Sequence, residues 1–202
     1  MSPDEYCQNK AAQSGSSFYY SFLFLPNEKR RAITALYAFC REVDDVVDDC
    51  TDEGVARQKL AWWHQQVSAL FQDRAEHPVM QALLPHRDRC QLTAERMHAV
   101  IEGMEMDLDQ SRYLDWPGLR KYCWHAASVV GQLSVGVFGY NNPATLEYAE
   151  KLGIAADIEK VTDPKSIAMA GVMSTPGIAV DGKLVHAGGL PDKAKLEAWL
   201  SA

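Results

Sequence analysis

The sequence predicts a mainly α-helical protein, in which a helical segment over residues 1–150 is followed by a small α/β segment over residues 151–202. Two patterns indicate this fold class. Apolar residues recur every three or four positions as far as residue 138, as on the buried faces of packed helices, and no strand pattern precedes residue 155. Towards the C-terminus, an Asp-Gly pair separates two short apolar runs, which is typical of a β-hairpin.

The composition supports a boundary near residue 150 and excludes several classes of protein. Of the 202 residues, 47% are hydrophobic and 23% are charged, as in soluble globular proteins. The net charge of −7 lies in residues 1–150, which hold 14 Lys and Arg against 21 Asp and Glu, whereas residues 151–202 hold six of each. This acidic balance argues against a nucleic-acid surface. No apolar run is long enough for a membrane span, and the acidic N-terminus is unlike a secretory signal.

Each element is expected from a local signal. Regular apolar spacing predicts long helices over 26–49, 55–71 and 93–108, the third capped by Thr93. Pro78 and Pro85 bracket a short helix, and Asp115 is expected to cap a helix to residue 138, because Pro117 suits its first turn. The rest of the chain predicts a helix over 144–152, a strand over 156–161, a helix over 162–171, a hairpin over 178–186 and a final helix from residue 191.

The cysteines and histidines predict no metal or redox site. Cys7, Cys40, Cys50, Cys90 and Cys123 form no close pair of the C-x-x-C type, by which zinc and dithiol sites are usually recognised. Scattered thiols of this kind are expected to be reduced and mostly buried. The six histidines show no ligand spacing either.

A carboxylate cluster at the end of the first long helix is the richest candidate site. Asp44 and Asp48 are four residues apart, as are Asp45 and Asp49, so each pair shares a helix face. Like charges at this spacing repel, and a divalent cation would relieve the repulsion; Mg²⁺ combines a few carboxylates with waters and substrate phosphates. The alternative is a solvated acidic helix end, a common surface feature. The valines between these acids favour the metal site, because they draw the cluster towards a core.

Other polar groups extend this candidate site. Arg41 precedes Asp44 by three residues and Tyr37 precedes Arg41 by four, so one helix stripe carries a hydroxyl, a guanidinium suited to phosphate oxygens and the carboxylates. Upstream, the hydroxyl-rich run 14–20 comes before a helix start and could bind an anion. Downstream, Asp107 and Asp109 place a second acidic pair at a helix end, with the same solvated alternative.

These motifs follow one another in an order that resembles the squalene/phytoene synthase family over residues 5–154. The resemblance is carried by residues 14–26 (SGSSFYYSFLFLP), 35–48 (ALYAFCREVDDVVD), 103–108 (GMEMDL), 112–114 (RYL) and the words YC, VVG and FGY within 122–140. Bacterial presqualene diphosphate synthases are the members that it resembles most. An ordered series of motifs is far more specific than the acidic pair alone.

The resemblance implies an isoprenoid-synthase helical bundle with an apolar cavity, in which two farnesyl diphosphates are joined head to head. Mg²⁺ would help diphosphate to leave, and a dry apolar wall would protect the allylic cation. By position, the metal ligands would be Asp44, Asp45 and Asp48, while Arg41 and Tyr37 would meet the diphosphate or the departing proton. The residues implied at the substrate end and the cavity wall are Ser17, Phe18, Tyr122, Ala127, Val130 and Gly131.

The resemblance to the synthases ends near residue 155. There the family has a second carboxylate motif of the type N-x-x-R-D-x-x-E-D, whereas this chain reads ADIEKVTDP over 156–164. Residues 150–202 resemble instead the C-terminal half of a thioredoxin-like redox-active disulfide protein, with Thr175 and Pro176 as its cis-proline loop. The hypothesis is a truncated synthase segment fused to a thioredoxin-like fragment without its C-x-x-C half, by recombination, by a frame or assembly error, or by design.

Three functions stand as alternatives. The first is a Mg²⁺-dependent prenyltransferase with farnesyl diphosphate as its substrate. The second is a thioredoxin-like thiol–disulfide protein, which needs a cysteine pair near Pro176 supplied by a distant residue such as Cys123. The third is a non-catalytic helical module that binds diphosphate or a partner. The expected location is the cytoplasm, with a peripheral position at the inner membrane as an alternative.

Overall fold

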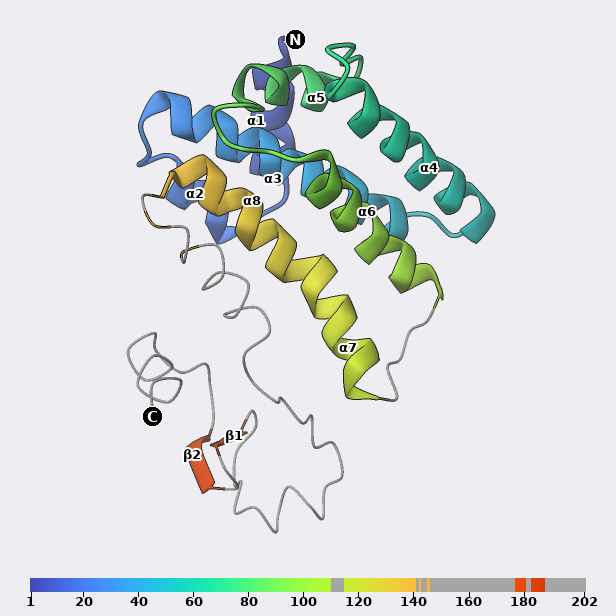
Figure 1. Cartoon of the computed structure of the whole chain (residues 1–202), viewed down its shortest axis with the longest axis vertical. Helices are drawn as coiled ribbons and strands as arrows, with labels where there is room; N and C mark the ends of the chain where they lie inside the picture. The colour runs from blue at the N-terminus through green and yellow to red at the C-terminus, as the bar shows by residue number, and fades with distance from the viewer. Residues whose placement is uncertain (110–114, 141, 143–144, 146–176, 181–182, 188–202) are drawn as a thin grey trace. The chain divides into compact units, whose positions relative to one another are not determined.

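The computed structural model describes residues 1–109, 115–140, 142, 145, 177–180 and 183–187 (Figure 1). The chain divides into two compact units, Met1–Ala156 and Asp157–Ala202. The described residues of the first unit form helices and their connections, which confirms the predicted mainly α fold. The boundary predicted at residue 150 lies outside the described residues.

The described part of the first unit contains the helices predicted before residue 143 and one that no sequence pattern indicates, α1. The three long helices predicted over 26–49, 55–71 and 93–108 are α3, α4 and α6, and their ends lie within two residues of the expected ones. In chain order, the elements are α1 (Pro3–Gln13), α2 (Ser17–Phe22), α3 (Asn27–Asp48), α4 (Glu53–Leu70), α5 (Pro78–Leu83), the 3₁₀ turn η1 (Leu84–His86), α6 (Ala94–Asp109), α7 (Trp116–Cys123), the π-helical turn η2 (Trp124–Ser128) and α8 (Val129–Phe138).

Side-chain caps explain where several helices begin. Asp115 accepts a hydrogen bond from a backbone amide of α7 at 2.7 Å, and Thr93 accepts one from α6 at 3.3 Å, as predicted. Asp52 accepts one from α4 at 3.0 Å, so α4 begins at Glu53, before the first residue of the apolar pattern. Each cap satisfies an amide that has no partner inside its helix.

The helix α1 is stabilised at its start rather than by a regular apolar face. Among its residues, Cys7 and Ala11 are the buried ones. Ser2 accepts a hydrogen bond from the Glu5 amide at 3.2 Å, and the Glu5 carboxylate accepts one from the Ser2 amide at 2.7 Å, which forms a capping box. The helix then packs against α3 and α5. These tertiary contacts, which periodicity does not reveal, complete its stabilisation.

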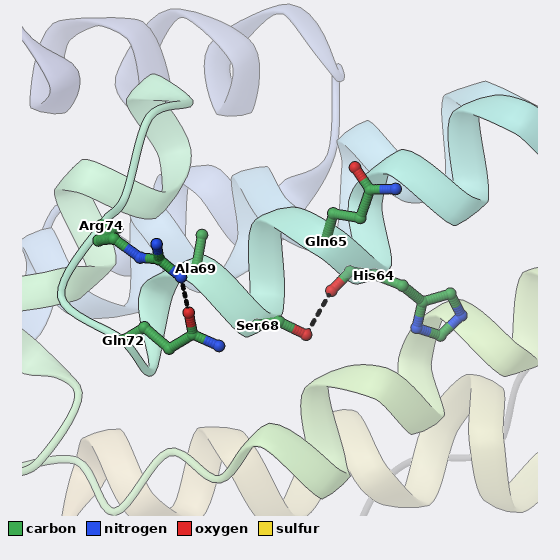
Figure 2. A pocket seen from close by; sticks show the side chains of 6 residues that line it. All are labelled: His64, Gln65, Ser68, Ala69, Gln72 and Arg74. Carbon is green, nitrogen blue, oxygen red and sulfur yellow. Dashed lines mark hydrogen bonds between the residues drawn. The ribbon is translucent and has the colours of Figure 1, made fainter.

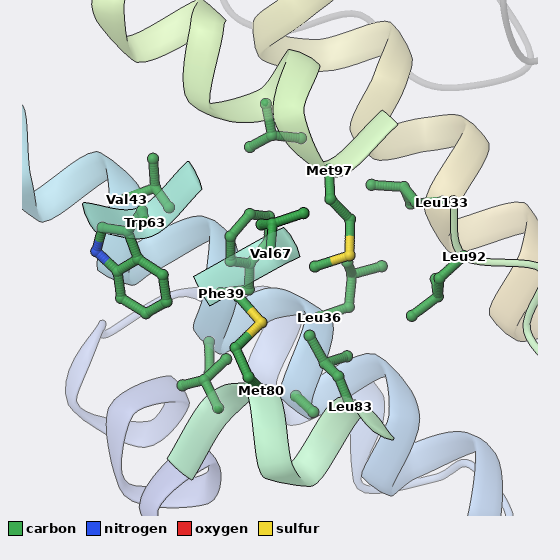
Figure 3. Close-up of a cluster of buried hydrophobic side chains, with 14 of the residues drawn as sticks. Leu36, Phe39, Val43, Trp63, Val67, Met80, Leu83, Leu92, Met97 and Leu133 are labelled. Carbon is green, nitrogen blue, oxygen red and sulfur yellow. The ribbon is translucent and has the colours of Figure 1, made fainter. Parts of the chain in front are cut away.

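The long helix α3 lies among the others and packs against α1, α2, α4, α5, α6 and α8 (Figure 1). Its apolar face is buried, since Leu36, Phe39 and Val43 are at most 1% exposed. Phe39 meets Trp63 of α4 edge to face, with ring centroids 5.9 Å apart. Figure 3 shows these side chains packed with those of α4, α5, α6 and α8. This burial holds the acidic end of α3 in a defined place.

The helix predicted from residue 115 to 138 is present as α7 and α8, but with an unpredicted π-helical turn, η2, between them. The π-helical turn lies where this part of the chain passes close to α6. A Cβ atom on Gly103 would lie 3.0 Å from the Cβ of His125, and one on Gly136 would lie 2.1 Å from the carbonyl oxygen of Cys90. Glycine at both positions therefore permits the close packing of this segment.

The second unit contains the predicted hairpin. Strands β1 (Gly177–Val180) and β2 (Lys183–Ala187) pair antiparallel, with Val180 opposite Lys183 and a register shift between Ile178 and Ala179. The predicted turn residues 181–182 and, apart from Thr145, the other elements expected beyond residue 143 lie outside the described residues. None of the helices described in either unit is long and apolar enough to cross a membrane.

Candidate functional site

The C-terminal half of α3 carries the predicted site residues Tyr37, Arg41, Asp44, Asp45 and Asp48. They lie beside one another because residues three or four apart share a helix face. Asp48 is exposed, whereas the other four are partly buried. The valines between them belong to the core or pack against it. The acidic cluster therefore lies at the edge of the core, as its apolar neighbours predict.

Arg41 binds two of these carboxylates at once. One of its guanidinium nitrogens lies 2.5 Å from Oδ2 of Asp44, and the other contacts Oδ1 of Asp45. Hydrogen bonds between ionised partners are stronger than neutral ones, and the planar guanidinium suits two acceptors. Arg41 thus neutralises part of the charge that would otherwise force these carboxylates apart.

Lys10 reaches the same cluster from α1. Its Nζ lies 2.8 Å from Asp45 and 3.2 Å from Glu42. The hydroxyl of Tyr6 donates a hydrogen bond to Glu42 at 2.7 Å. The sequence did not indicate Lys10 or Tyr6, because no spacing along the chain connects α1 to α3.

A further carboxylate, Asp107, joins the site electrostatically from α6. Helix α6 packs against α3, and the charges of Asp44, Asp48 and Asp107 act on one another. Tyr122 of α7 donates a hydrogen bond to Asp107 at 3.1 Å. The sequence marked Asp107 only as half of an acidic pair at a helix end, and the resemblance marked Tyr122 only as a cavity residue. The tertiary structure joins them.

The electrostatics of the site reflect crowding of negative charge. Burial is the main cause that raises the pKa of Asp44; Arg41 opposes it, and repulsion from Asp48 and Asp107 adds to it. Burial also raises the pKa of Asp107, while its bond from Tyr122 opposes the shift and Asp48 increases it. For Arg41, burial lowers the pKa, but the nearby carboxylates outweigh this effect and the net shift is upward. A bound cation would relieve this repulsion.

Tyr37 connects the cluster to the residues before α3. Its hydroxyl donates a hydrogen bond to Oγ of Ser14 at 3.1 Å, and its ring meets Phe22 edge to face at 5.7 Å. Of the two residues that the resemblance places at the substrate end, Ser17 begins α2 and Phe18 is 65% exposed. Tyr37 and the hydroxyl-rich run thus meet in the structure, whereas Phe18 lies at the surface.

The residues that the resemblance places on the cavity wall have mixed surroundings. Ala127, in η2, is exposed, and Val130 is partly buried against the core. Gly131 of α8 has open space where a side chain would begin, since no heavy atom beyond its chain neighbours and its own helix backbone lies within 4 Å of its Cβ position. These three residues lie on consecutive turns and do not enclose a cavity by themselves.

The carboxylates fit one mode of magnesium binding. Within the described part of the chain, no group of three or more His, Cys, Asp or Glu side chains is placed to hold a metal ion alone. Mg²⁺, however, is commonly held by one or two carboxylates together with waters and substrate phosphates. Asp44 and Asp48 suit that mode, because both carboxylates reach solvent and repel each other. The donor set therefore fits a magnesium ion shared with a bound diphosphate.

A surface pocket on α4 does not coincide with this site. Figure 2 shows two hydrogen bonds among its lining residues: Ser68 donates one to the His64 carbonyl at 3.0 Å, and Arg74 donates one to Gln72. Its lining contains no carboxylate and none of the predicted site residues. The lining residues are His64, Gln65, Ser68, Ala69, Gln72 and Arg74.

The fold also pairs two histidines that have no ligand spacing in the sequence. Nδ1 of His64 lies 2.7 Å from Nδ1 of His98, and Nε2 of His64 lies 3.4 Å from Glu105. In the first contact, one ring nitrogen must donate and the other must accept. This cluster joins α4 to α6.

Comparison with known proteins agrees with the sequence resemblance. The family model for squalene/phytoene synthases matches residues 11–158, and a thioredoxin domain model matches residues 142–201. A phytoene synthase of Arthrospira platensis is 32% identical over 139 residues, or 69% of this chain and 45% of that protein. A presqualene diphosphate synthase of Rhodopseudomonas palustris is 34% identical over 148 residues, or 73% of this chain and 53% of that protein. The crystal structure of a squalene synthase from Alicyclobacillus acidocaldarius has a TM-score of 0.68 at 27% identity and covers 76% of this chain and 57% of its own.

These matches place the first unit in a family. The chain spans about half the length of the curated relatives it matches, or less. Thr175 and Pro176 fall within the thioredoxin match but outside the described residues. The synthase model covers most of the chain and contains every motif that carries the resemblance. The chain belongs to the squalene/phytoene synthase family.

Proposed function

We propose that this chain supplies diphosphate-binding helices of a Mg²⁺-dependent prenyltransferase, which joins two farnesyl diphosphates head to head to give presqualene diphosphate or squalene. The observation that carries the proposal is the pair of contacts made by Arg41, whose guanidinium binds both Asp44 and Asp45. The charges of Asp48 and Asp107 act on the same cluster. The phytoene and presqualene diphosphate synthases among the relatives support a prenyl diphosphate as the substrate.

The proposal assigns a role to each side chain of the cluster. Asp44 and Asp48 would hold Mg²⁺, which when bound neutralises the charge that develops on a leaving diphosphate. Arg41 would donate hydrogen bonds to diphosphate oxygens from the nitrogen that now contacts Asp44. Asp107 would add negative charge on the α6 side, with its carboxylate oriented by Tyr122.

The chemistry breaks the bond between C1 of the prenyl chain and the diphosphate oxygen. The electron pair leaves with diphosphate, and an allylic cation remains. Tyr37, partly buried and hydrogen-bonded to Ser14, would lie near the departing diphosphate or a departing proton. Val130 and Gly131 would contribute to the apolar wall that keeps water from the cation.

Incubation of the purified chain with Mg²⁺ and labelled farnesyl diphosphate tests the proposal. We expect diphosphate release that requires Mg²⁺ and falls by about 100-fold in Asp44→Asn, because the substitution removes a proposed ligand of the Mg²⁺ that stabilises the leaving diphosphate. Asp4→Asn is the matched control, since Asp4 binds Arg31 at 2.6 Å at the other end of α3. Its release rate should equal that of the unaltered protein.

Two results would count against diphosphate release by this chain. Substrate binding without diphosphate release would support a non-catalytic diphosphate-binding module instead. A chain that neither binds nor releases diphosphate would contradict both functions. Reduction of insulin by the chain would support the thioredoxin-like alternative, although its five cysteines are free thiols in the structure.

A further inference from the structure

Lys10 links α1 to the carboxylates of α3 through two ion pairs. Its Nζ lies 2.8 Å from Oδ2 of Asp45 and 3.2 Å from Oε1 of Glu42, and Tyr6 donates a hydrogen bond to the same Glu42 oxygen at 2.7 Å. The Lys10 side chain is 23% exposed, so solvent screens these ion pairs less than pairs on the open surface. The carboxylates of Glu42 and Asp45 thus hold the ammonium group of Lys10 in one position.

Asp45 and Asp44 differ in their contacts with cations and in their exposure to solvent. Both oxygens of Asp45 contact cations, Oδ2 with Lys10 and Oδ1 with Arg41. Asp44 contacts Arg41 through Oδ2, and its side chain is 37% exposed against 24% for Asp45. A metal ion at Asp45 would have to displace one of its two cations, whereas one at Asp44 has a more accessible carboxylate.

We propose that Lys10 is a positioning residue, which acts through Asp45 on Arg41, and that Asp45 anchors Arg41 instead of binding metal. Lys10 holds Asp45, Asp45 holds one nitrogen of Arg41, and the other nitrogen stays directed towards Asp44. This inference deepens the proposed function, because the proposed diphosphate would meet Arg41 at that second nitrogen.

The charges explain why Lys10 is needed. Without it, Asp44 and Asp45 would still share the guanidinium of Arg41, but Asp45 and Glu42 would lose the cation that they share. Repulsion between Asp45 and Glu42 would then turn Asp45 away, since both now share the ammonium group of Lys10. Arg41 would lose its second anchor and sample more orientations.

The first test observes Arg41 in the protein without ligand. We would record the side-chain ¹⁵N–¹H signals of arginine and assign that of Arg41 as the one lost in Arg41→Lys. Rotation of its guanidinium should be slow in the unaltered protein, faster in Lys10→Met and slow again in Lys10→Arg, which restores the charge. Arg31→Met is the control, because it breaks a different ion pair between α1 and α3, from Arg31 to Asp4.

The second test measures binding of inorganic pyrophosphate with Mg²⁺ by calorimetry. Lys10→Met and Asp45→Asn should each weaken binding by about 10-fold, and the double variant should be no weaker than either single one, since the two residues act in series. Asp44→Asn should abolish the Mg²⁺-dependent part. Arg31→Met should bind as the unaltered protein does.

The two tests separate this inference from the proposed function. An Arg41 signal unchanged by Lys10→Met would overturn the role of Lys10. Loss of Mg²⁺-dependent binding in Asp45→Asn as complete as in Asp44→Asn would show that Asp45 is itself a ligand. If the unaltered protein binds no pyrophosphate, the proposed function fails, and the Arg41 signal alone decides whether Lys10 positions that side chain.

Discussion

Tyr122 donates a hydrogen bond to Asp107 at 3.1 Å and so joins α7 to the last turn of α6. Burial raises the pKa of Asp107, this hydrogen bond opposes the shift, and the charge of Asp48 increases it. Tyr122 therefore favours the ionised form of Asp107, whose pKa is also affected by the charge of Asp48 on α3. This places a tyrosine known only from the family resemblance in direct contact with the acidic site.

Replacement of Tyr122 by phenylalanine should raise the pKa of Asp107 further, because the substitution removes the interaction that opposes burial. An NMR titration of the Asp107 carboxyl carbon measures this shift. Tyr140→Phe is a matched control, since Tyr140 donates to Gln91 at 2.7 Å instead. An Asp107 pKa that is equal in Tyr122→Phe and in the unaltered protein would contradict the assigned role.

The acidic site should cost stability in the ligand-free protein. Because the folded-state pKa of Asp107 is raised above its ordinary value of 3.8, the folded chain binds this proton more tightly than the unfolded chain does. The Asp107 carboxyl therefore stabilises the folded chain when the pH is below 3.8, and this contribution is lost as the pH rises through the folded-state pKa. At pH 7, Asp107→Asn should therefore raise the Tm by about 1–3 °C.

Two comparisons check this prediction. The gain in Tm should disappear near pH 3, where the carboxyl of Asp107 is protonated in both states. Asp109→Asn should give no gain, because Asp109 lies at the same helix end but accepts a hydrogen bond from Arg57 at 2.8 Å. A lower Tm for Asp107→Asn at neutral pH would show that the net interactions of the ionised carboxylate are favourable.

His77 should make the helical unit sensitive to mild acid. Its Nδ1 accepts a hydrogen bond from the Val79 amide at 3.3 Å, and its ring meets those of Trp63 and Tyr6 with centroids 4.8 and 5.4 Å away. Burial lowers its pKa below the ordinary histidine value of 6.5. The unfolded chain therefore takes up the proton more readily, and the free energy of unfolding should fall as the pH drops through about 6.5.

Thermal unfolding of His77→Asn between about pH 7.5 and 5.5 tests this effect. Asparagine can still cap α5 but does not titrate, so its Tm should decline less over this range than that of the unaltered protein. At the higher pH we expect a loss of about 1–2 kcal/mol from the missing ring contacts. The decline should be reduced rather than removed, because the pKa values of His86 and His98 are also lowered. An equal decline in both proteins would exclude His77 as a source.

Two glycines of α8 should respond in opposite ways to the same substitution. In Gly136→Ala, the new Cβ would lie 2.1 Å from the backbone oxygen of Cys90, so the two segments must separate, at a cost of about 1–3 kcal/mol. In Gly131→Ala, the new Cβ meets no atom within 4 Å, and alanine favours the helix by about 0.5–1 kcal/mol. Urea unfolding of both variants measures the difference. Equal effects would show that the close approach at Cys90 is not maintained in solution.

Most helices could be predicted because their signals are local. Apolar spacing indicates α3, α4 and α6, and Asp115 with Pro117 indicates the start of α7. The helix α1 has no regular apolar face, and the division of the last helix by η2 accompanies a close approach to Gly103 of α6. Neither feature leaves a periodic pattern in the chain.

The candidate site was likewise predictable from the sequence only where its residues lie on one helix. By itself, the sequence determined which acids share a stripe of α3, because the pitch of a helix sets which residues are neighbours, and its ordered motifs indicated the family. Tertiary structure decided the rest: Lys10 reaches Asp45 from α1, and Asp107 with Tyr122 joins from α6 and α7. These contacts depend on how the helices pack, and packing brings together residues that no fixed spacing connects. The mainly α fold expected at the outset is thus also what assembles the acidic site.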